Sequence, residues 1–340
     1  MEKRKSIPIR YIQRAILPLR RLSIIQAFLL RERSTFMYES FQALKETCLD
    51  SSAMKKRIVV AGAADEHALE AVFLAQEKGY VTPILIGNHD EVSRLVAQLG
   101  FEDAPYEIEH CSSETNPSSV AVGLIREGRG DFILKGKMET KDLLKPILNK
   151  ESGLNAGGFI THFGIMELKG YHKLLAMSDS AVIPYPSLED KIQITKLCSK
   201  ALMKLGYENP VIGALCAVET INPKMPETLD AQQLQQLSED GAFGAGIVVG
   251  PISFDLATRK EAAVIKGYPS PYAGEVDMLL VPNMVTGNVM SKIWNGDPEN
   301  ILAGCLIGAD VPIALTSRSA SMNEKLYSIL LCTLLSGSKA

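Results

Sequence analysis

A hydroxyl, a guanidinium and a carboxylate follow one another closely near the end of the chain, in Ser317, Arg318 and Glu324. They follow the apolar run 311–315, which is typical of a buried strand. An amphipathic stretch, typical of a helix, begins near Met322, between Arg318 and Glu324. A strand-to-helix turn collects backbone N–H groups and the positive end of a helix dipole, and an arginine adds a planar fork that matches phosphate. The sequence therefore predicts a site for a phosphate or an oxyanion at this turn.

Glu324 has a second explanation, as part of a helix cap. Ser321 is a good N-cap residue, and Glu324 stands three residues further on, which is the spacing of a capping box. The sequence leaves both roles open for Glu324, general base and cap. Ser317 and Arg318 have no such structural use, and all three residues are taken as candidate catalytic groups.

A second turn with phosphate-binding chemistry follows the strand expected at 131–134. Lys135 brings charge, Gly136 permits close approach of a backbone, and Thr140 is expected to cap the next helix. Lys145 lies five residues later and could point back toward the same end. A lysine-rich turn is more often solvated surface, so this signal is weak by itself.

A third loop, 282–288, follows the strand expected at 276–281 and is expected to leave on the same side of the sheet. Gly287 and Asn288 enter a helix there, so Asn288 is either an N-cap or an amide that touches a ligand. Asn283 lies just before them. The predicted substrate-binding residues are therefore Lys135, Gly136, Thr140, Lys145, Asn283, Gly287 and Asn288.

Strands and helices alternate in the first half of the chain, which predicts an α/β fold with a parallel sheet and helices on both faces. In such folds ligands gather at the carboxyl ends of the strands. The fingerprint G-x-G-x-x-G is absent after the first strand, where 62–67 reads GAADEH, so nicotinamide dinucleotide binding loses support. Strands are expected at 57–62, 81–86, 106–109, 131–134, 211–218, 245–249, 276–281, 304–308 and 311–315.

A run of glycines at 151–158 interrupts this alternation and is followed by two segments typical of a hairpin, 159–168 and 171–177. The predicted domains are therefore a discontinuous domain I, 37–160 plus 297–340, and a domain II, 161–296. Within domain II, two prolines in the loop 219–228 argue against a helix there, and a helix is expected from Asp230.

Composition excludes several classes of protein. The chain of 340 residues is 46% hydrophobic and 22% charged, which is typical of a well-cored globular protein and not of a disordered or fibrous one. The six cysteines and five histidines are scattered without the spacing of a zinc site, so no metal is expected. We interpret the cysteines as reduced thiols of a cytoplasmic protein.

Residues 1–36 differ from the rest, with nine Lys or Arg against two Glu. Their longest apolar run, 22–30, is too short to span a bilayer. A peripheral or transit-like helix, a nucleic-acid arm and an extension upstream of a start at Met37 are the three interpretations, and the third is favoured. No nucleic-acid or membrane partner is expected for the remainder.

Several loops together resemble the family of phosphate acetyltransferases and phosphate butyryltransferases, over about residues 55 to 335. The resemblance rests on Lys135-Gly136 with Thr140, Val218-Glu219-Thr220, Asn222-Pro223-Lys224-Met225-Pro226, Ser270-Pro271 with Ala273-Gly274, Gly287-Asn288 and Thr316-Ser317-Arg318. The element 222–226 is more similar to the butyryl branch.

The resemblance implies that acyl-CoA and phosphate are exchanged for acyl phosphate and CoA, with coenzyme A as a substrate and no cofactor or metal. It also implies a two-domain αβα sandwich similar to the isocitrate and isopropylmalate dehydrogenases, assembled as a homodimer or larger oligomer. Small-molecule substrates, acyl-CoA and phosphate, are the expected partners.

Four positions depart from the family pattern. Lys145 stands where relatives carry an arginine, and Asn283 and Val249 stand where they carry aspartates. Glu324 occupies the place of an aspartate in the acetyl branch. Two alternatives follow: a protein that binds CoA or acyl phosphate without turnover, and a nicotinamide-dependent dehydrogenase of similar fold.

Overall fold

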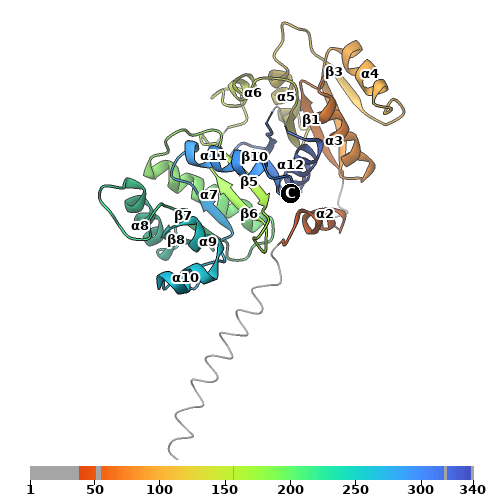
Figure 1. The fold of residues 1–340 in the computed structure, drawn as a ribbon. Coiled ribbons are helices and arrows are strands. Elements are labelled where there is room, and N and C mark those ends of the chain that lie inside the picture. Colours follow the sequence, from red (N-terminus) through yellow and green to blue (C-terminus); the bar gives the residue numbers. More distant parts are fainter. Residues whose placement is uncertain (1–37, 51–54, 156, 318–319, 338–340) are drawn as a thin grey trace, which may run out of the picture. The chain divides into compact units, whose positions relative to one another are not determined.

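The computed structural model of the protein describes residues 38–50, 55–155, 157–317 and 320–337. The basic segment 1–36 and Arg318 lie outside these residues. The described chain has an α/β fold built on one sheet of eleven strands (Figure 1), in the order β3-β2-β1-β4-β11-β10-β5-β6-β9-β7-β8. The predicted α/β class is thus confirmed.

The strands are β1 Lys56–Ala61, β2 Val81–Gly87, β3 Glu107–His110, β4 Phe132–Lys135, β5 Thr161–Glu167, β6 Leu175–Ser178, β7 Val211–Leu215, β8 Ile247–Ile252, β9 Met278–Leu280, β10 Ile301–Ile307 and β11 Ile313–Ala314. The helices are α2 Phe41–Asp50, α3 Glu66–Glu77, α4 His89–Gln98, α5 Pro117–Arg126, α6 Thr140–Ile147, α7 Leu188–Lys204, α8 Pro226–Glu239, α9 Phe254–Thr258, α10 Lys260–Lys266, α11 Met284–Asn295 and α12 Met322–Leu335.

The sheet is mixed, which corrects the expectation of a parallel sheet. Strands β1 to β4 and β11 run parallel to one another, and so do β6, β9, β7 and β8. Between these groups β10 is antiparallel to β11 and β5, and β5 is antiparallel to β6. The predicted hairpin of β5 and β6 is confirmed.

One consequence of these strand directions concerns the loop after β9. Because β9 runs antiparallel to β4 and β11, the loop 281–283 that follows it leaves the sheet in the opposite direction to the turns that follow Lys135 of β4 and contain Ser317 after β11. The expectation that all three leave on the same side is wrong. The predicted domains stay a prediction, since the sheet continues from one into the other through the pairing of β10 with β5.

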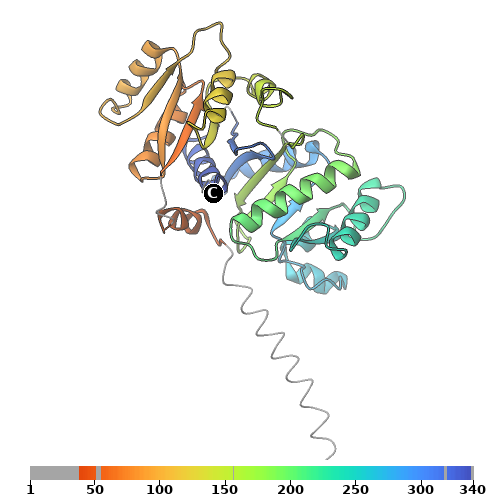
Figure 2. The ribbon, with the colours of Figure 1, turned by 180° about the vertical axis from the view of Figure 1, so that it is seen from behind.

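Helices cover both faces of the sheet and bury its apolar side chains. Helices α5 and α6 contribute Ala121, Leu124, Leu143 and Ile147 to one core cluster, together with Ile133 of β4. Figure 2 shows α7 lying across the sheet, where it contacts β5 and β10. Burying such side chains gains about 1.5–3 kcal/mol each before entropy is counted, so this core holds the strand ends in place.

Local signals set most helix starts. Asp65 caps α3 by accepting a hydrogen bond from Ala68 N, and Asn116 caps α5 with Pro117 at its first turn. Helix α8 begins at Pro226, four residues before the predicted start. A proline fits the first turn of a helix because its missing N–H has no intrahelical partner there, so the loop prediction fails for residues 226–228.

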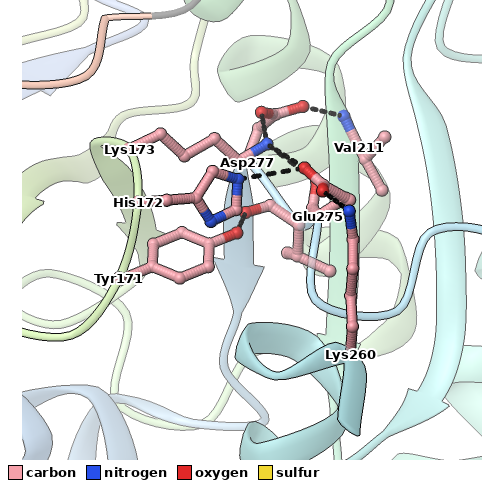
Figure 3. Close-up of polar contacts among 8 residues, drawn as sticks. Tyr171, His172, Lys173, Val211, Lys260, Glu275 and Asp277 are labelled. Carbon is pink, nitrogen blue, oxygen red and sulfur yellow. Dashed lines mark hydrogen bonds and ion pairs between the residues drawn. The ribbon is translucent and has the colours of Figure 1, made fainter. Parts of the chain in front are cut away.

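A buried ion pair fixes the starts of three parallel strands (Figure 3). Lys173 Nζ lies 2.5 Å from Asp277 Oδ1, and Asp277 Oδ2 accepts a hydrogen bond of 2.7 Å from Val211 N. Glu275 contacts His172 Nε2 at 3.1 Å and also pairs with Lys260. These residues precede or begin β6, β7 and β9, so the network sets the register at the amino ends of those strands.

Candidate active site

The turn after β4 packs closely on the turn after β1. Gly136 N donates to Ala61 O at 2.9 Å, and Lys137 N donates to Gly62 O at 2.8 Å. A Cβ atom added to Gly136 would lie 2.1 Å from Gly62 O, a distance that no side chain permits. Gly136 is therefore required by chain packing, and this packing positions Lys135, which is only 4% exposed.

A cavity of about 800 Å³ opens beside this turn. The starts of four helices meet around it, through Asp65 before α3, Asn116 before α5, Glu139 before α6 and Lys325 in the first turns of α12. Helix N-termini present N–H groups and a positive partial charge, which favours anions.

The charges around this cavity differ in their burial. Its buried charged residues are both cationic, Lys135 and Lys325, at 4% and 3% exposure. Four carboxylates also line it: Glu114 and Glu139 are exposed, Asp142 is half-buried, and Asp65 is engaged as a helix cap. The interior of the cavity is therefore suited to phosphate.

The turn after β11 lies beside the turn after β4, because β11 pairs with β4 in parallel and Ala314 is opposite Leu134. Ser317 is exposed at this turn. The buried Oγ1 of Thr316 has no hydrogen-bond partner among the described residues, which is a rare and costly state for a hydroxyl. The structure thus brings Ser317 and Lys135 onto adjacent strand ends, while Ser317 is not among the described residues that line the cavity of Lys135.

Glu324 takes part in a capping box at the start of α12. Ser321 N donates to Glu324 Oε2 at 2.9 Å, and Glu324 N donates to Ser321 Oγ at 3.2 Å. The cap that the sequence allows is confirmed, and the role of general base stays a prediction.

We expect Glu324→Gln to keep turnover within about tenfold of the original, because glutamine also serves at this position of a capping box. Steady-state rates and melting temperature measure the effect. A loss of about 100-fold at unchanged melting temperature would instead assign Glu324 to general base catalysis.

Thr140 and Lys145, two predicted substrate-binding residues near Lys135, do not lie where the sequence led us to expect them. The N-cap of α6 is Glu139, without a side-chain cap, and Thr140 is the first helical residue, so the capping role of Thr140 is wrong. Lys145 is exposed in the last turn of α6 and is not among the described residues that line the cavity. A contact of either residue with substrate stays a prediction.

Asn283 lies at the start of α11, whereas Gly287 and Asn288 lie where this helix contacts the loop after β6. Asn283 is the N-cap, since its Oδ1 accepts from Thr286 N at 3.0 Å. Asn288 lies inside the helix and donates to Ser180 O at 3.1 Å, so its prediction as N-cap is wrong. A Cβ atom on Gly287 would lie 3.0 Å from Asp179 O.

That loop carries residues that the sequence pattern did not single out. Asp179 is buried, and its carboxylate accepts from Thr161 Oγ1 at 2.7 Å and from three backbone N–H groups, of His162, Ala181 and Val182. His162 Nδ1 lies 2.9 Å from Ser180 Oγ, and burial lowers the pKa of His162 although Asp179 opposes the shift. No spacing signal marks them, because the contacts join separate strands.

Two of the motifs named in the sequence analysis, Glu219-Thr220 and Ser270-Pro271, line a second cavity, of about 990 Å³, along β8. Gly250-Pro251, Lys266 and Tyr268 also line it. Lys266 Nζ lies 2.6 Å from Glu219 Oε1 and 3.0 Å from Asp255 Oδ2, and Ser253 Oγ is within 2.7 Å of both carboxylates.

This cluster makes the protein sensitive to acid. The hydrogen bond from Ser253 and then that from Lys266 lower the pKa of Asp255 to about 2. A carboxyl group with a lowered pKa stabilises the fold above its ordinary pKa near 3.9, and the gain disappears as pH falls toward about 2. We expect the free energy of unfolding to fall more steeply between pH 4 and 2 in the original protein than in Asp255→Asn. Equal slopes would contradict the assignment.

The described residues contain no group of three or more His, Cys, Asp or Glu side chains placed to hold a metal ion. No helix within the described part of the chain is long and apolar enough to cross a membrane.

Comparison with known proteins shows the family of the chain. A family model described as phosphate acetyl/butaryl transferase matches residues 106–333. The phosphate butyryltransferase of Clostridium acetobutylicum is 38% identical over 284 residues, which cover 84% of this chain and 94% of that protein. The phosphate acetyltransferase of Thermotoga maritima is 34% identical over 276 residues, 81% of this chain and 94% of that one.

A solved structure is also similar, that of a branched-chain phosphotransacylase from Enterococcus faecalis. Its TM-score is 0.75 at 29% sequence identity, covering 83% of this chain and 99% of that chain. The chain belongs to the phosphate acetyl/butyryl transferase family of enzymes.

Proposed function

We propose that the protein transfers a butyryl group between coenzyme A and inorganic phosphate at the strand-to-helix turn of β11. The observation that carries the proposal is the pair of buried lysines, Lys135 and Lys325, in a cavity surrounded by four helix starts beside Ser317. The butyryl preference is supported by the likeness of residues 222–226 to the butyryl branch and by the identity with a phosphate butyryltransferase.

The proposed reaction is direct. A phosphate oxygen attacks the carbonyl carbon of acyl-CoA, an oxyanion forms on the carbonyl oxygen, and the C–S bond breaks to release CoA thiolate. Ser317 and nearby backbone N–H groups hold the oxyanion, while Arg318 and Lys135 hold phosphate. In the reverse direction CoA thiolate attacks acyl phosphate.

Thiol chemistry of the protein itself is disfavoured. The cysteines whose side chains are described are all buried, and burial raises the pKa of Cys111 and raises that of Cys216 to about 12. A thiol with a raised pKa is a poor nucleophile at neutral pH. This supports transfer without a covalent acyl-enzyme. The free thiols also support a cytoplasmic location as part of the proposal.

The test is release of CoA from acyl-CoA esters of two to six carbons in the presence of phosphate. We expect the highest specificity constant for butyryl-CoA. Activity with none of the esters would overturn the proposal, and calorimetric titration would then separate a CoA-binding protein from one that binds NAD. A homodimer or larger oligomer, also proposed, is tested by light scattering.

A further inference from the structure

Lys325 occupies an unfavourable position for a lysine. It lies near the start of α12, where the helix dipole is positive, and its side chain is only 4% exposed. A cation at a helix N-terminus is repelled by the dipole, and burial of an ammonium group is costly without a close partner. Such a residue needs a compensating anion.

The described partner of Lys325 compensates it only in part. Its Nζ lies 3.7 Å from Asp65 Oδ2, which is beyond hydrogen-bond distance. The other oxygen of Asp65 accepts a hydrogen bond from Ala68 N at 2.9 Å and so caps α3. The ammonium group of Lys325 therefore keeps donors for a further acceptor.

Lys325 shares its cavity with Lys135, and the two are the buried charges among the lining residues that the structure describes. They come from different elements, the turn after β4 and the first turns of α12. A volume of about 800 Å³ admits phosphate with part of a larger substrate. Two buried cations and four helix starts favour a further anion in this cavity, in addition to the carboxylates of Asp65 and Asp142 that line it.

We propose that Lys325 is a phosphate-binding residue, which holds inorganic phosphate, or the phosphoryl group of acyl phosphate, opposite Lys135. The proposal rests on the function proposed above and adds a residue to it. Lys325 forms no bond to the substrate. Its ammonium group offsets the charge of the phosphate dianion and orients one oxygen toward the acyl carbon. Phosphate groups of CoA present the same chemistry, so the test must separate the two sources.

Lys325→Met removes the charge and keeps a side chain of similar shape. We expect KM for phosphate to rise by about 10- to 100-fold, since hydrogen bonds to charged groups contribute of this order. KM for acyl-CoA should stay within about threefold, because Lys325 is assigned to phosphate and not to CoA. Equal increases in both constants would assign Lys325 to the CoA phosphates and overturn the proposal.

Two matched variants distinguish binding from packing. Lys196→Met, on the exposed face of α7, makes the same charge change away from the cavity and should leave both constants unchanged. Lys325→Arg retains the charge and should recover part of the phosphate affinity. The proposal is supported if Lys325→Met melts at or above the temperature of the original protein and if phosphate no longer raises that temperature. Phosphate is added at about 50 to 100 mM, which is on the order needed to saturate a weak site.

The outcomes remain decisive if the enzyme is inactive. Stabilisation of the original protein by phosphate, lost in Lys325→Met, supports the binding role whatever the rate of acyl transfer. If Lys325→Met and Lys325→Gln both unfold, the residue belongs to the core and the proposal fails. If both variants fold and bind phosphate as the original protein does, the proposal for Lys325 also fails. Acyl transfer by the original protein would in that case leave the proposed function intact.

Discussion

Replacing Ser317 by alanine lowers turnover by about 100- to 1000-fold, the usual loss when one donor to an oxyanion is removed. KM for acyl-CoA changes little, because the hydroxyl acts on the transition state and not on bound substrate. Steady-state kinetics with butyryl-CoA and phosphate measure both constants. Ser93→Ala, in helix α4, is the matched control and should behave as the original protein.

Arg318→Lys extends this test to the neighbouring residue. The substitution keeps the charge and removes the planar fork, so affinity for phosphate and turnover should both weaken at an unchanged melting temperature. Normal kinetics in the double variant Ser317→Ala, Arg318→Lys would remove the whole turn from the mechanism.

We expect Asp277→Asn to destabilise the fold by about 3–5 kcal/mol, because it removes the carboxylate at 2.5 Å from the buried ammonium of Lys173. The carboxylate of Glu275 remains, but it is more distant, at 3.8 Å. The side chains of Lys173 and Asp277 are 1% and 5% exposed, so water cannot replace the lost partner. Asparagine can still accept the hydrogen bond from Val211 N, which isolates the effect of charge. Urea denaturation gives the free energy of unfolding.

Two further variants serve as controls. The double variant Lys173→Met, Asp277→Asn removes both charges and should recover most of the free energy of unfolding that Asp277→Asn loses. Lys260→Met removes an ion pair whose lysine side chain is 65% exposed and should change stability by no more than about 1 kcal/mol. If Asp277→Asn were as stable as Lys260→Met, the network of Figure 3 would not fix these strands.

The two turns of the site follow from local sequence. A short apolar run that ends in Lys135-Gly136, and another that ends in Thr316-Ser317, are both typical of a strand that enters a turn. The capping box of Ser321 and Glu324 is equally local. These elements depend on neighbours along the chain, and the structure has them where the sequence predicts them.

The directions of the central strands could not be predicted in the same way. The antiparallel pairing of β10 with β11 joins neighbours in sequence, but the antiparallel pairing of β10 with β5 joins partners far apart, such as Ala303 and Ile165. The same limit applies to Asn288. Gly-Asn before an apolar stretch fits a helix start, but Asn283 takes that place and Asn288 contacts the loop after β6.

Lys325 shows why the site could be predicted only in part. Its sequence position near a helix start is visible, yet its burial results from the packing of α12 on α3 and on the sheet. A lysine in that position on an exposed helix would be an ordinary surface residue. Tertiary packing turns it into a candidate ligand for phosphate.

In the proposed reaction, phosphate itself accepts the acyl group at the turn of Ser317. The direct measurement is the amount of butyryl phosphate, followed by phosphorus NMR, against the CoA released from butyryl-CoA. We expect equal amounts of the two products, a rate that depends on phosphate concentration, and loss of both products in Ser317→Ala. Release of CoA at the same rate in the absence of phosphate, or release of CoA with no butyryl phosphate formed, would contradict this reaction.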